Sequence, residues 1–371
     1  MTIRKILATL LALSMTLSLA ACGGNSTQTD TTAPSEQTEQ TEEAPTESDE
    51  SAAENTETET PADETEASEP AEKVDINLAA LSGPTALGML DLLEKNENGE
   101  AANNYNVTIA TAPDEVTGKI ISGELDIAAV PTNVAATLYN KTEGQVQIAA
   151  LNTMGVLYVL ETGDTIQSVA DLAGKTIYAT GQGSTPEYAL NLVLEKNGLT
   201  PGEDVEIVFA ADNAEIAPLL ASGEAQVALL PQPFVTSVLT QNENVRVALD
   251  LTEEWAKAVN GESGLTMGCV VVRKEFAEQN KEALDRFLDE YKQSVETVTS
   301  EEGLAHAAEL AEHYNIIKAA VAEKAIPECN IVFVEGDEMQ QIAGGFLQVL
   351  YDANPQAVGG QLPNDDFYYK R

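Results

Sequence analysis

The sequence is poor in basic residues. Its 371 residues include 19 Lys and Arg against 61 Asp and Glu, and the formal net charge at pH 7 is -42. A nucleic-acid partner is therefore excluded, because phosphate backbones need a basic face. An anionic lipid surface would not attract this chain either. A small anionic ligand is not excluded, since helix N-termini can hold one without lysine or arginine.

Cysteine and histidine are also scarce. Of the three cysteines, Cys269 and Cys329 lie in apolar runs, which predicts two buried free thiols; a disulfide between them is the alternative. His306 and His313 lie seven residues apart in a helical stretch with no cluster of metal-ligand residues around them, so we expect both on the surface. The sequence therefore predicts neither a metal site nor a cofactor.

Long apolar runs are absent except at the N-terminus. Arg4 and Lys5 precede an apolar segment over 6–19, which ends in Leu-Ala-Ala before Cys22. This layout predicts a signal peptide over 1–21 and a bacterial lipobox, with a lipid on Cys22. A membrane span is the weaker alternative, because the run is shorter than the ~20 residues that a span needs. We expect the mature chain at the extracytoplasmic face of the cell membrane, held there by its lipid anchor only.

The segment 22–73 is predicted to be the lipidated cysteine followed by a disordered acidic linker. Residues 23–73 contain 16 Asp and Glu, one Lys, no aromatic residue and no Leu, Ile, Val or Met. Such a composition cannot bury enough apolar surface to offset the entropy of ordering. Repulsion between like charges should extend the segment further.

Residues 74–371 alternate β-rich and helical stretches. Alternating strands and helices with nearly continuous apolar strands favour parallel sheets covered on both faces. After a last β-prone run at 265–273, the chain is mostly helical. The predicted strands are 74–81, 105–111, 125–130, 145–151, 175–180, 204–210, 225–230, 245–249 and 265–273. The predicted helices are 84–95, 113–121, 132–138, 185–196, 214–220, 234–239, 278–298, 302–314, 318–324 and 337–352.

An internal repeat indicates two similar lobes. Residues 115–131 (EVTGKIISGELDIAAVP) and 215–231 (EIAPLLASGEAQVALLP) share six identical positions, and each reads as helix, Ser-Gly-Glu turn, buried strand and proline. The fold class is therefore α/β, with two Rossmann-like lobes and a cleft between them. We expect 74–163 plus 265–371 to form lobe 1, and 164–264 to form lobe 2. Two hinge crossovers would join the lobes near 153–164 and 259–266.

Several segments resemble one family, the ABC-transporter solute-binding proteins of type II periplasmic-binding-protein topology. Within it, the chain is similar to the nitrate, sulfonate and taurine group, which includes thiamine-pyrimidine binders. The resemblance covers 74 to about 350. It is carried by SGELDIA at 122–128, KTIY at 175–178 leading to GSTP at 183–186, PQPF at 231–234 and VVRKEF at 271–276. The sequence departs from its own repeat at Gln226, where the first copy has Asp126, and it lacks the clustered cysteines of the pyrimidine-synthase relatives.

The resemblance implies a lipoprotein that captures a small-molecule solute and delivers it to the permease of an ABC importer, as a monomer and not as an enzyme. No Gly-x-Ser-x-Gly, no Gly-rich phosphate loop with lysine and no metal triad is present. Two alternatives stay open. One is an enzyme of the same fold acting on a small cofactor or aromatic precursor, and the other is a surface adhesin or sensor input domain.

The ligand is expected beyond the carboxyl ends of the parallel strands, where helices begin. Hydroxyl and free N–H groups at such helix starts hold carboxylates, sulfonates or polar ring edges, although each Ser or Thr could also be a plain helix cap. Trp255, the only tryptophan, is either a stacking platform for the solute or a core residue. The candidate ligand-binding residues are Ser82, Gly83, Pro84, Thr85, Thr132, Asn133, Asn152, Thr153, Gly183, Ser184, Thr185, Gln232, Phe234 and Trp255.

Overall fold

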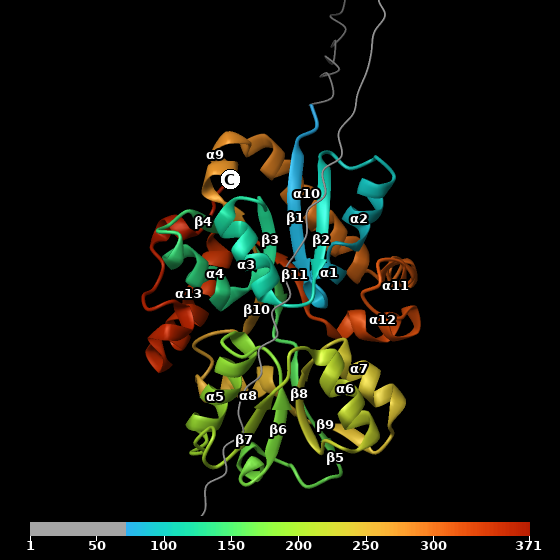
Figure 1. The fold of residues 1–371 in the computed structure, drawn as a ribbon, viewed down its shortest axis with the longest axis vertical. Coiled ribbons are helices and arrows are strands. Elements are labelled where there is room, and N and C mark those ends of the chain that lie inside the picture. Colours follow the sequence, from blue (N-terminus) through green and yellow to red (C-terminus); the bar gives the residue numbers. More distant parts are fainter. Residues whose placement is uncertain (1–71) are drawn as a thin grey trace, which may run out of the picture. The chain divides into compact units, whose positions relative to one another are not determined.

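The computed structural model describes residues 72–371, which belong to one compact unit. The predicted signal peptide, the lipid site at Cys22 and nearly all of the predicted linker lie outside the described residues. Two mixed sheets with helices on both faces organise the unit, so the predicted α/β fold class is confirmed (Figure 1). None of the helices in residues 72–371 is both long and apolar enough to span a membrane.

The first sheet has six strands in the order β11-β4-β10-β3-β1-β2. β1 runs parallel to β2 and β3, whereas β10 is antiparallel to β3 and β4, and β11 is antiparallel to β4. The chain returns from the second sheet through β10, which we call the return strand and which lies in the middle of the first sheet. The strands are β1 (Asp75–Leu81), β2 (Asn104–Ala110), β3 (Ile127–Pro131), β4 (Val146–Met154), β10 (Thr266–Arg273) and β11 (Ile331–Val334).

The second sheet has five strands in the order β7-β6-β8-β5-β9. β6 is parallel to β7 and β8, and β5 is antiparallel to β8 and β9. The order and directions match those of β2-β1-β3-β10-β4 in the first sheet. The strands are β5 (Leu157–Thr162), β6 (Thr176–Ala179), β7 (Glu206–Phe209), β8 (Val227–Pro231) and β9 (Val245–Asp250).

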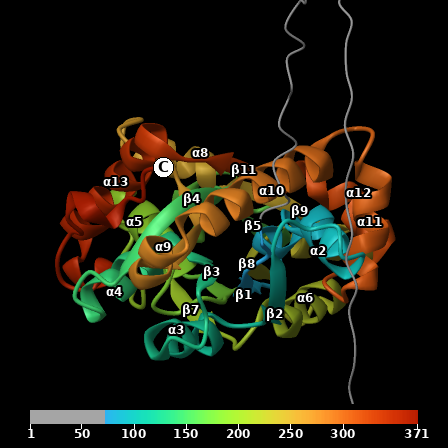
Figure 2. The same ribbon diagram turned by 90° about the horizontal axis from the view of Figure 1, so that it is seen from above.

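Helices cover both faces of each sheet because the strands are apolar on both sides. Side chains alternate along β1, so Ile76 and Leu78 pack in one cluster with α2, α10, α11 and α12, and Ala79 packs in another with α4 and α13. Figure 2 shows the places of these helices. In the second sheet α5 and α8 lie on one face, and α6 and α7 on the other. The helices of the strand–helix repeat are α1 (Pro84–Leu87), α2 (Leu90–Glu97), α3 (Pro113–Ser122), α4 (Thr132–Lys141), α5 (Thr185–Lys196), α6 (Asn213–Ser222), α7 (Phe234–Gln241) and α8 (Leu251–Ala258). The C-terminal helices are α9 (Lys274–Gln279), α10 (Lys281–Thr299), α11 (Leu304–His313), α12 (Ala319–Ala325) and α13 (Gly336–Ala353).

The repeated sequence has a repeated structure. Residues 115–131 form most of α3 and β3, and 215–231 form most of α6 and β8. Both helices end at a glycine in the left-handed region, Gly123 at φ 80° and Gly223 at φ 82°, which only glycine adopts without strain. The Ser-Gly-Glu motif is thus a helix-ending turn that feeds the next buried strand.

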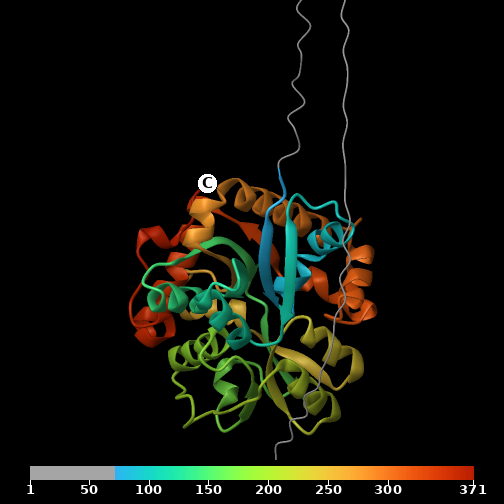
Figure 3. The ribbon, with the colours of Figure 1, turned by 45° about the horizontal axis from the view of Figure 1, so that its top comes forward.

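The structure corrects the sequence interpretation at three places. The chain crosses between the sheets at residues 155 and 156, because β5 pairs with β8 and β9; residues 157–162 therefore do not share the sheet of lobe 1, where the boundary at 163 placed them (Figure 3). The predicted helix 84–95 is two helices, broken beside Gly88, where an added Cβ would lie 3.0 Å from Ile331 Cγ2. The edge strand β11, only four residues long, was not predicted.

Candidate functional site

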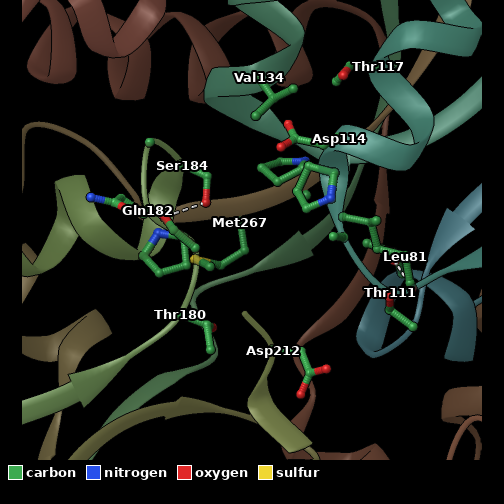
Figure 4. Close-up of a pocket in the computed structure, with 18 of the residues that line it drawn as sticks. Leu81, Thr111, Asp114, Thr117, Val134, Thr180, Gln182, Ser184, Asp212 and Met267 are labelled. Carbon is green, nitrogen blue, oxygen red and sulfur yellow. Dashed lines mark hydrogen bonds between the residues drawn. The ribbon is translucent and has the colours of Figure 1, made fainter. Parts of the chain in front are cut away.

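A cavity of about 540 Å³ lies where strands of both sheets end. Its wall includes the ends of β1, β3 and β8 at Leu81, Pro131 and Pro231, and the loops that follow β2, β6 and β7. Figure 4 shows Asp114 and Val134 on helices of the first lobe, facing Ser184 and Gln182 of the second. This is the position that the sequence analysis assigned to the ligand. Its volume suits an organic molecule rather than a single small ion.

Six of the candidate residues line this cavity. They are Ser82, Pro84, Thr85 and Thr153 beside the first sheet, and Gly183 and Ser184 beside the second. Three of their hydroxyls already donate a hydrogen bond: Thr85 to Leu81 O (2.6 Å), Thr153 to Asn152 Oδ1 (3.2 Å) and Ser184 to Gly181 O (2.8 Å). Ser184 begins α5 without a side-chain cap bond, so its hydroxyl oxygen remains available to accept.

The other eight candidates do not line the cavity. Thr132 is fully buried and its hydroxyl bonds that of Thr266 at 2.7 Å. Gln232 Oε1 accepts from the N–H and hydroxyl of Thr236, so this side chain caps α7. Phe234 is half-buried and packs against the core of the second lobe. The eight are Gly83, Thr132, Asn133, Asn152, Thr185, Gln232, Phe234 and Trp255.

Trp255 is a core residue and not an exposed platform. Its ring is completely buried on α8 and lies 5.5 Å from the ring of Phe346 on α13, centroid to centroid. The indole N–H donates to Ser263 O at 3.1 Å. Of the two sequence interpretations, the structure therefore supports packing. The ring joins a helix of the second lobe to the C-terminal helix that covers the first.

Asn133 and Thr185 bond to each other across the lobes. The Thr185 hydroxyl donates to Asn133 Oδ1 at 3.0 Å, and Asn133 Nδ2 donates to Ala357 O at 3.1 Å and, more weakly, to Gly183 O at 3.4 Å. Both side chains are buried, with Asn133 1% exposed and Thr185 not exposed at all. Their polar groups therefore hold α4 against α5 beside the cavity.

Two loops of the wall were missed by the sequence analysis. Residues 111–114 follow β2 and residues 210–213 follow β7, and both runs line the cavity. The rule about carboxyl ends of parallel strands would have found them had it been applied to these outer strands as well. Met267 and Gly268 were also missed, because they begin the antiparallel return strand β10, to which the rule does not apply.

Three helices that start at the cavity carry a glutamate at their third position. The carboxylates of Glu115, Glu187 and Glu215 accept from the N–H groups of Ala112, Gly183 and Ala211, respectively. At α3, hydrogen bonds led by the Thr111 hydroxyl lower the pKa of Glu115, which keeps it charged. The positive ends of α3, α5 and α6 are therefore partly neutralised from within the chain. α4 differs, because Val134 stands at its third position.

The charged side chains of the cavity wall are unbalanced. Asp114 on α3 and Asp212 before α6 form no ion pair within the described residues, and Lys141 is the basic residue of the wall. Asp212 Oδ1 accepts from Glu215 N at 3.0 Å, so part of its charge serves as a helix cap. The wall thus offers two carboxylates, several hydroxyls and one ammonium group at the end of α4.

The thiols and histidines lie elsewhere. Cys269 and Cys329 are free and buried, as expected, and burial raises the pKa of both thiols. His306 and His313 are exposed on α11, where they face Glu94 and Glu97. Residues 72–371 contain no group of three or more His, Cys, Asp or Glu placed to hold a metal ion.

Comparison with known proteins gives a consistent result. The family model described as "ABC transporter, phosphonate, periplasmic substrate-binding protein" matches residues 92–323. An ABC transporter structure from Parabacteroides distasonis is 25% identical over 80% of this chain and 99% of that one, with a TM-score of 0.66. No curated protein matches the sequence.

Two sulfonate-binding proteins share the fold. The aliphatic sulphonate binding protein SsuA of Escherichia coli is 15% identical over 80% of this chain and 92% of its own, with a TM-score of 0.61. The alkanesulfonate-binding SsuA of Xanthomonas axonopodis pv. citri, bound to MOPS, is 17% identical over 79% and 96%, with a TM-score of 0.60. At this level of identity the likeness concerns the fold alone.

Proposed function

Because the chain belongs to the phosphonate family of periplasmic substrate-binding proteins of ABC transporters, we propose that its cavity captures a small organic solute with an oxyanion group and an amine. The solute then passes to the permease of an ABC importer. One observation carries the proposal. Loops from both sheets bring hydroxyls to one cavity that also holds two carboxylates with no basic partner among residues 72–371.

The oxyanion belongs at the start of α4 in this proposal. The starts of α3, α5 and α6 already hold a glutamate of the chain, whereas α4 has none. Ser82 lies on the same wall, and its hydroxyl donates no hydrogen bond to another described residue, so this hydroxyl can turn toward a ligand oxygen. Backbone N–H groups at a helix start hold oxyanions without a cation.

The amine belongs between Asp114 and Asp212. These carboxylates come from the two lobes, so an ammonium group bonded to both would favour the closed arrangement. Such a contact is stronger than a neutral hydrogen bond. A solute with the oxyanion alone would leave both carboxylates unpaired, and one with the amine alone would leave α4 without an anion.

Calorimetry with 2-aminoethylphosphonate, ethylphosphonate and ethylamine tests this proposal. We expect the first to bind best, and Ser184→Ala to weaken it about fivefold through loss of a polar contact. Ser222→Ala, at the exposed far end of α6, is the matched control and should change nothing. Equal affinity for ethylphosphonate would refute the role of the amine, and no binding by any of the three would refute the solute class.

The same proposal includes the anchor and the motion. Cys22 carries the lipid, so Cys22→Ala should leave the membrane fraction; a membrane-bound, lipid-modified variant would exclude this site.

We propose that lobe 1 and lobe 2 close as a hinged clamp, with the protein as a monomer. X-ray scattering on the wild type with 2-aminoethylphosphonate should then show a smaller radius of gyration at the mass of one chain.

A further inference from the structure

The cavity continues out of the cleft between two helices of the first lobe. α3 and α4 both begin at the cleft and lead away from it. Asp114, Thr117 and Ile121 line the cavity from α3, and Val134, Leu138 and Lys141 line it from α4. Spacings of three, four and seven residues place each set on one face of its helix. Two helix faces therefore border one groove, which we call the α3–α4 groove.

The α3–α4 groove combines polar residues near the cleft, Asp114 and Thr117, with the apolar Ile121 and Val134 beyond them, and it is basic at its end. Ile121 is 52% exposed, which makes it the most exposed of the large hydrophobic side chains in residues 72–371. Val134 and Leu138 line the groove from the other side (Figure 4 shows Val134). Lys141 closes it, about 10 Å along α4 from Val134. Lys141 forms no ion pair with another described residue, so its ammonium group is free to meet a ligand.

The second lobe lacks such a groove. Its equivalent helices α6 and α7 pack against each other, while α3 and α4 lie further apart. Ala221 occupies the position of Ile121, and Phe234 the position of Val134, with Phe234 half-buried against the core of that lobe. Ile121 and Lys141 also border a second cavity of about 370 Å³ that reaches Arg273. The opening is therefore a feature of the first lobe and not a general consequence of the fold.

We propose that the α3–α4 groove binds an elongated apolar arm of the solute, with an anionic group at the far end of that arm beside Lys141. This inference deepens the function proposed above and rests on it. The head of the solute occupies the cleft, and the arm covers exposed Ile121 and half-buried Val134, above the buried Leu138. Burial of the arm removes from water the apolar surface that the structure leaves exposed there.

Alkylphosphonates from methyl to hexyl test the arm, and 6-phosphonohexanoate tests its end. Affinity should rise about two- to fourfold for each added methylene. Ile121→Ser should flatten this rise while leaving methylphosphonate binding unchanged. Lys141→Met should remove an advantage of about fivefold that we expect for 6-phosphonohexanoate over hexylphosphonate. Val247→Ser, at an exposed apolar residue on β9, is the control and should leave the whole series intact.

The outcomes separate this inference from the function on which it rests. A flat series in the wild type, or a rise that Ile121→Ser leaves intact, overturns the arm subsite even if the short phosphonates bind. If no alkylphosphonate binds, 1-hexanol probes the groove alone. If 2-aminoethylphosphonate also fails to bind, the proposed head group is wrong. Shifts of the Ile121, Val134 and Leu138 methyl NMR signals with 1-hexanol support the groove, and their absence refutes it.

Discussion

The two lobes share a plan but differ in how charged groups secure it. In the first lobe, Arg273 N donates to Asp126 O at 3.0 Å, and in the second, Thr162 N donates to Gln226 O at 2.8 Å. These are equivalent backbone bonds between the incoming antiparallel strand and the repeat strand. In the first lobe the two side chains also form an ion pair, with Arg273 Nη2 2.9 Å from Asp126 Oδ1.

In the second lobe the ion pair joins a different pair of neighbouring strands. Glu161 on β5 pairs with Arg246 on β9 at 2.9 Å, and Glu161 is only 2% exposed. Gln226 stands where the first copy has Asp126, and its neighbour on the incoming strand is Thr162, which offers no positive charge. The backbone hydrogen bond is thus the same in both lobes, whereas the ion pair depends on which residues the antiparallel strand, β10 or β5, brings to each sheet.

Removing the Trp255 side chain should have the largest effect on stability. The ring of Trp255 in the second lobe packs against Phe346 on α13, and the first lobe has no tryptophan. Trp255→Ala should lower the free energy of unfolding by about 3–5 kcal/mol, because a large core side chain leaves a cavity. Chemical denaturation measures this loss. Trp255→Phe should retain most of the stability and all of the ligand affinity; a large loss of affinity would restore the stacking role.

A paired substitution tests the difference in charge between the lobes. Asp126→Asn removes the charge that pairs with Arg273 Nη2, which keeps only the exposed Glu275 as an ionic partner. It also leaves one acceptor oxygen where Asp126 offers separate oxygens to Arg273 and Asn77 N, so we expect a loss of about 2 kcal/mol. Gln226→Asp places the same charge at the exposed equivalent position, and we expect a change within about 0.5 kcal/mol. Urea unfolding of both variants measures the contrast. Similar losses would show that the equivalence of the lobes extends to their charges.

The smallest effect should come from acid titration of Glu161. Burial opposes its charge, but the N–H groups of Ile166 and Thr165, the Thr165 hydroxyl and Arg246 together lower its pKa. A lowered pKa in the folded state adds stability above the unfolded-state value of about 4.3, which is lost as the pH falls through the folded pKa. Between pH 6 and pH 3, Glu161→Gln should therefore lose less stability than the wild type. Parallel curves for the two proteins would contradict this.

The sequence predicted local elements better than the contacts between them. The helix over 185–196 coincides with α5, since Pro186 and the apolar period mark it locally. At the break, Ile331 and Tyr291 approach Gly88 too closely for a larger residue, and both are distant in sequence, so no local pattern could reveal this contact. β5 was left as a crossover because which sheet a short apolar run joins is a long-range matter.

The prediction of the binding site from the sequence was limited in the same way, because it depends on contacts between distant residues. Strand ends and helix starts led to Ser82, Thr85 and Ser184 on the cavity wall. Asn133 and Thr185 have the residue types of ligand contacts, but they satisfy each other, and a sequence does not show partners. The α3–α4 groove was not foreseen, because the distance between two helices depends on what packs beneath them and not on either helix alone.

The Asn133–Thr185 bond bears on the timing of solute release. Any motion that separates α4 from α5 must break this bond where both side chains are sealed from water. Water can repay the lost bond only after the gap has opened, so the cost falls on the barrier more than on the final open state. In the proposed clamp, the pair would therefore slow spontaneous opening and lengthen the residence time of a captured solute, so that release would depend on contact with the permease.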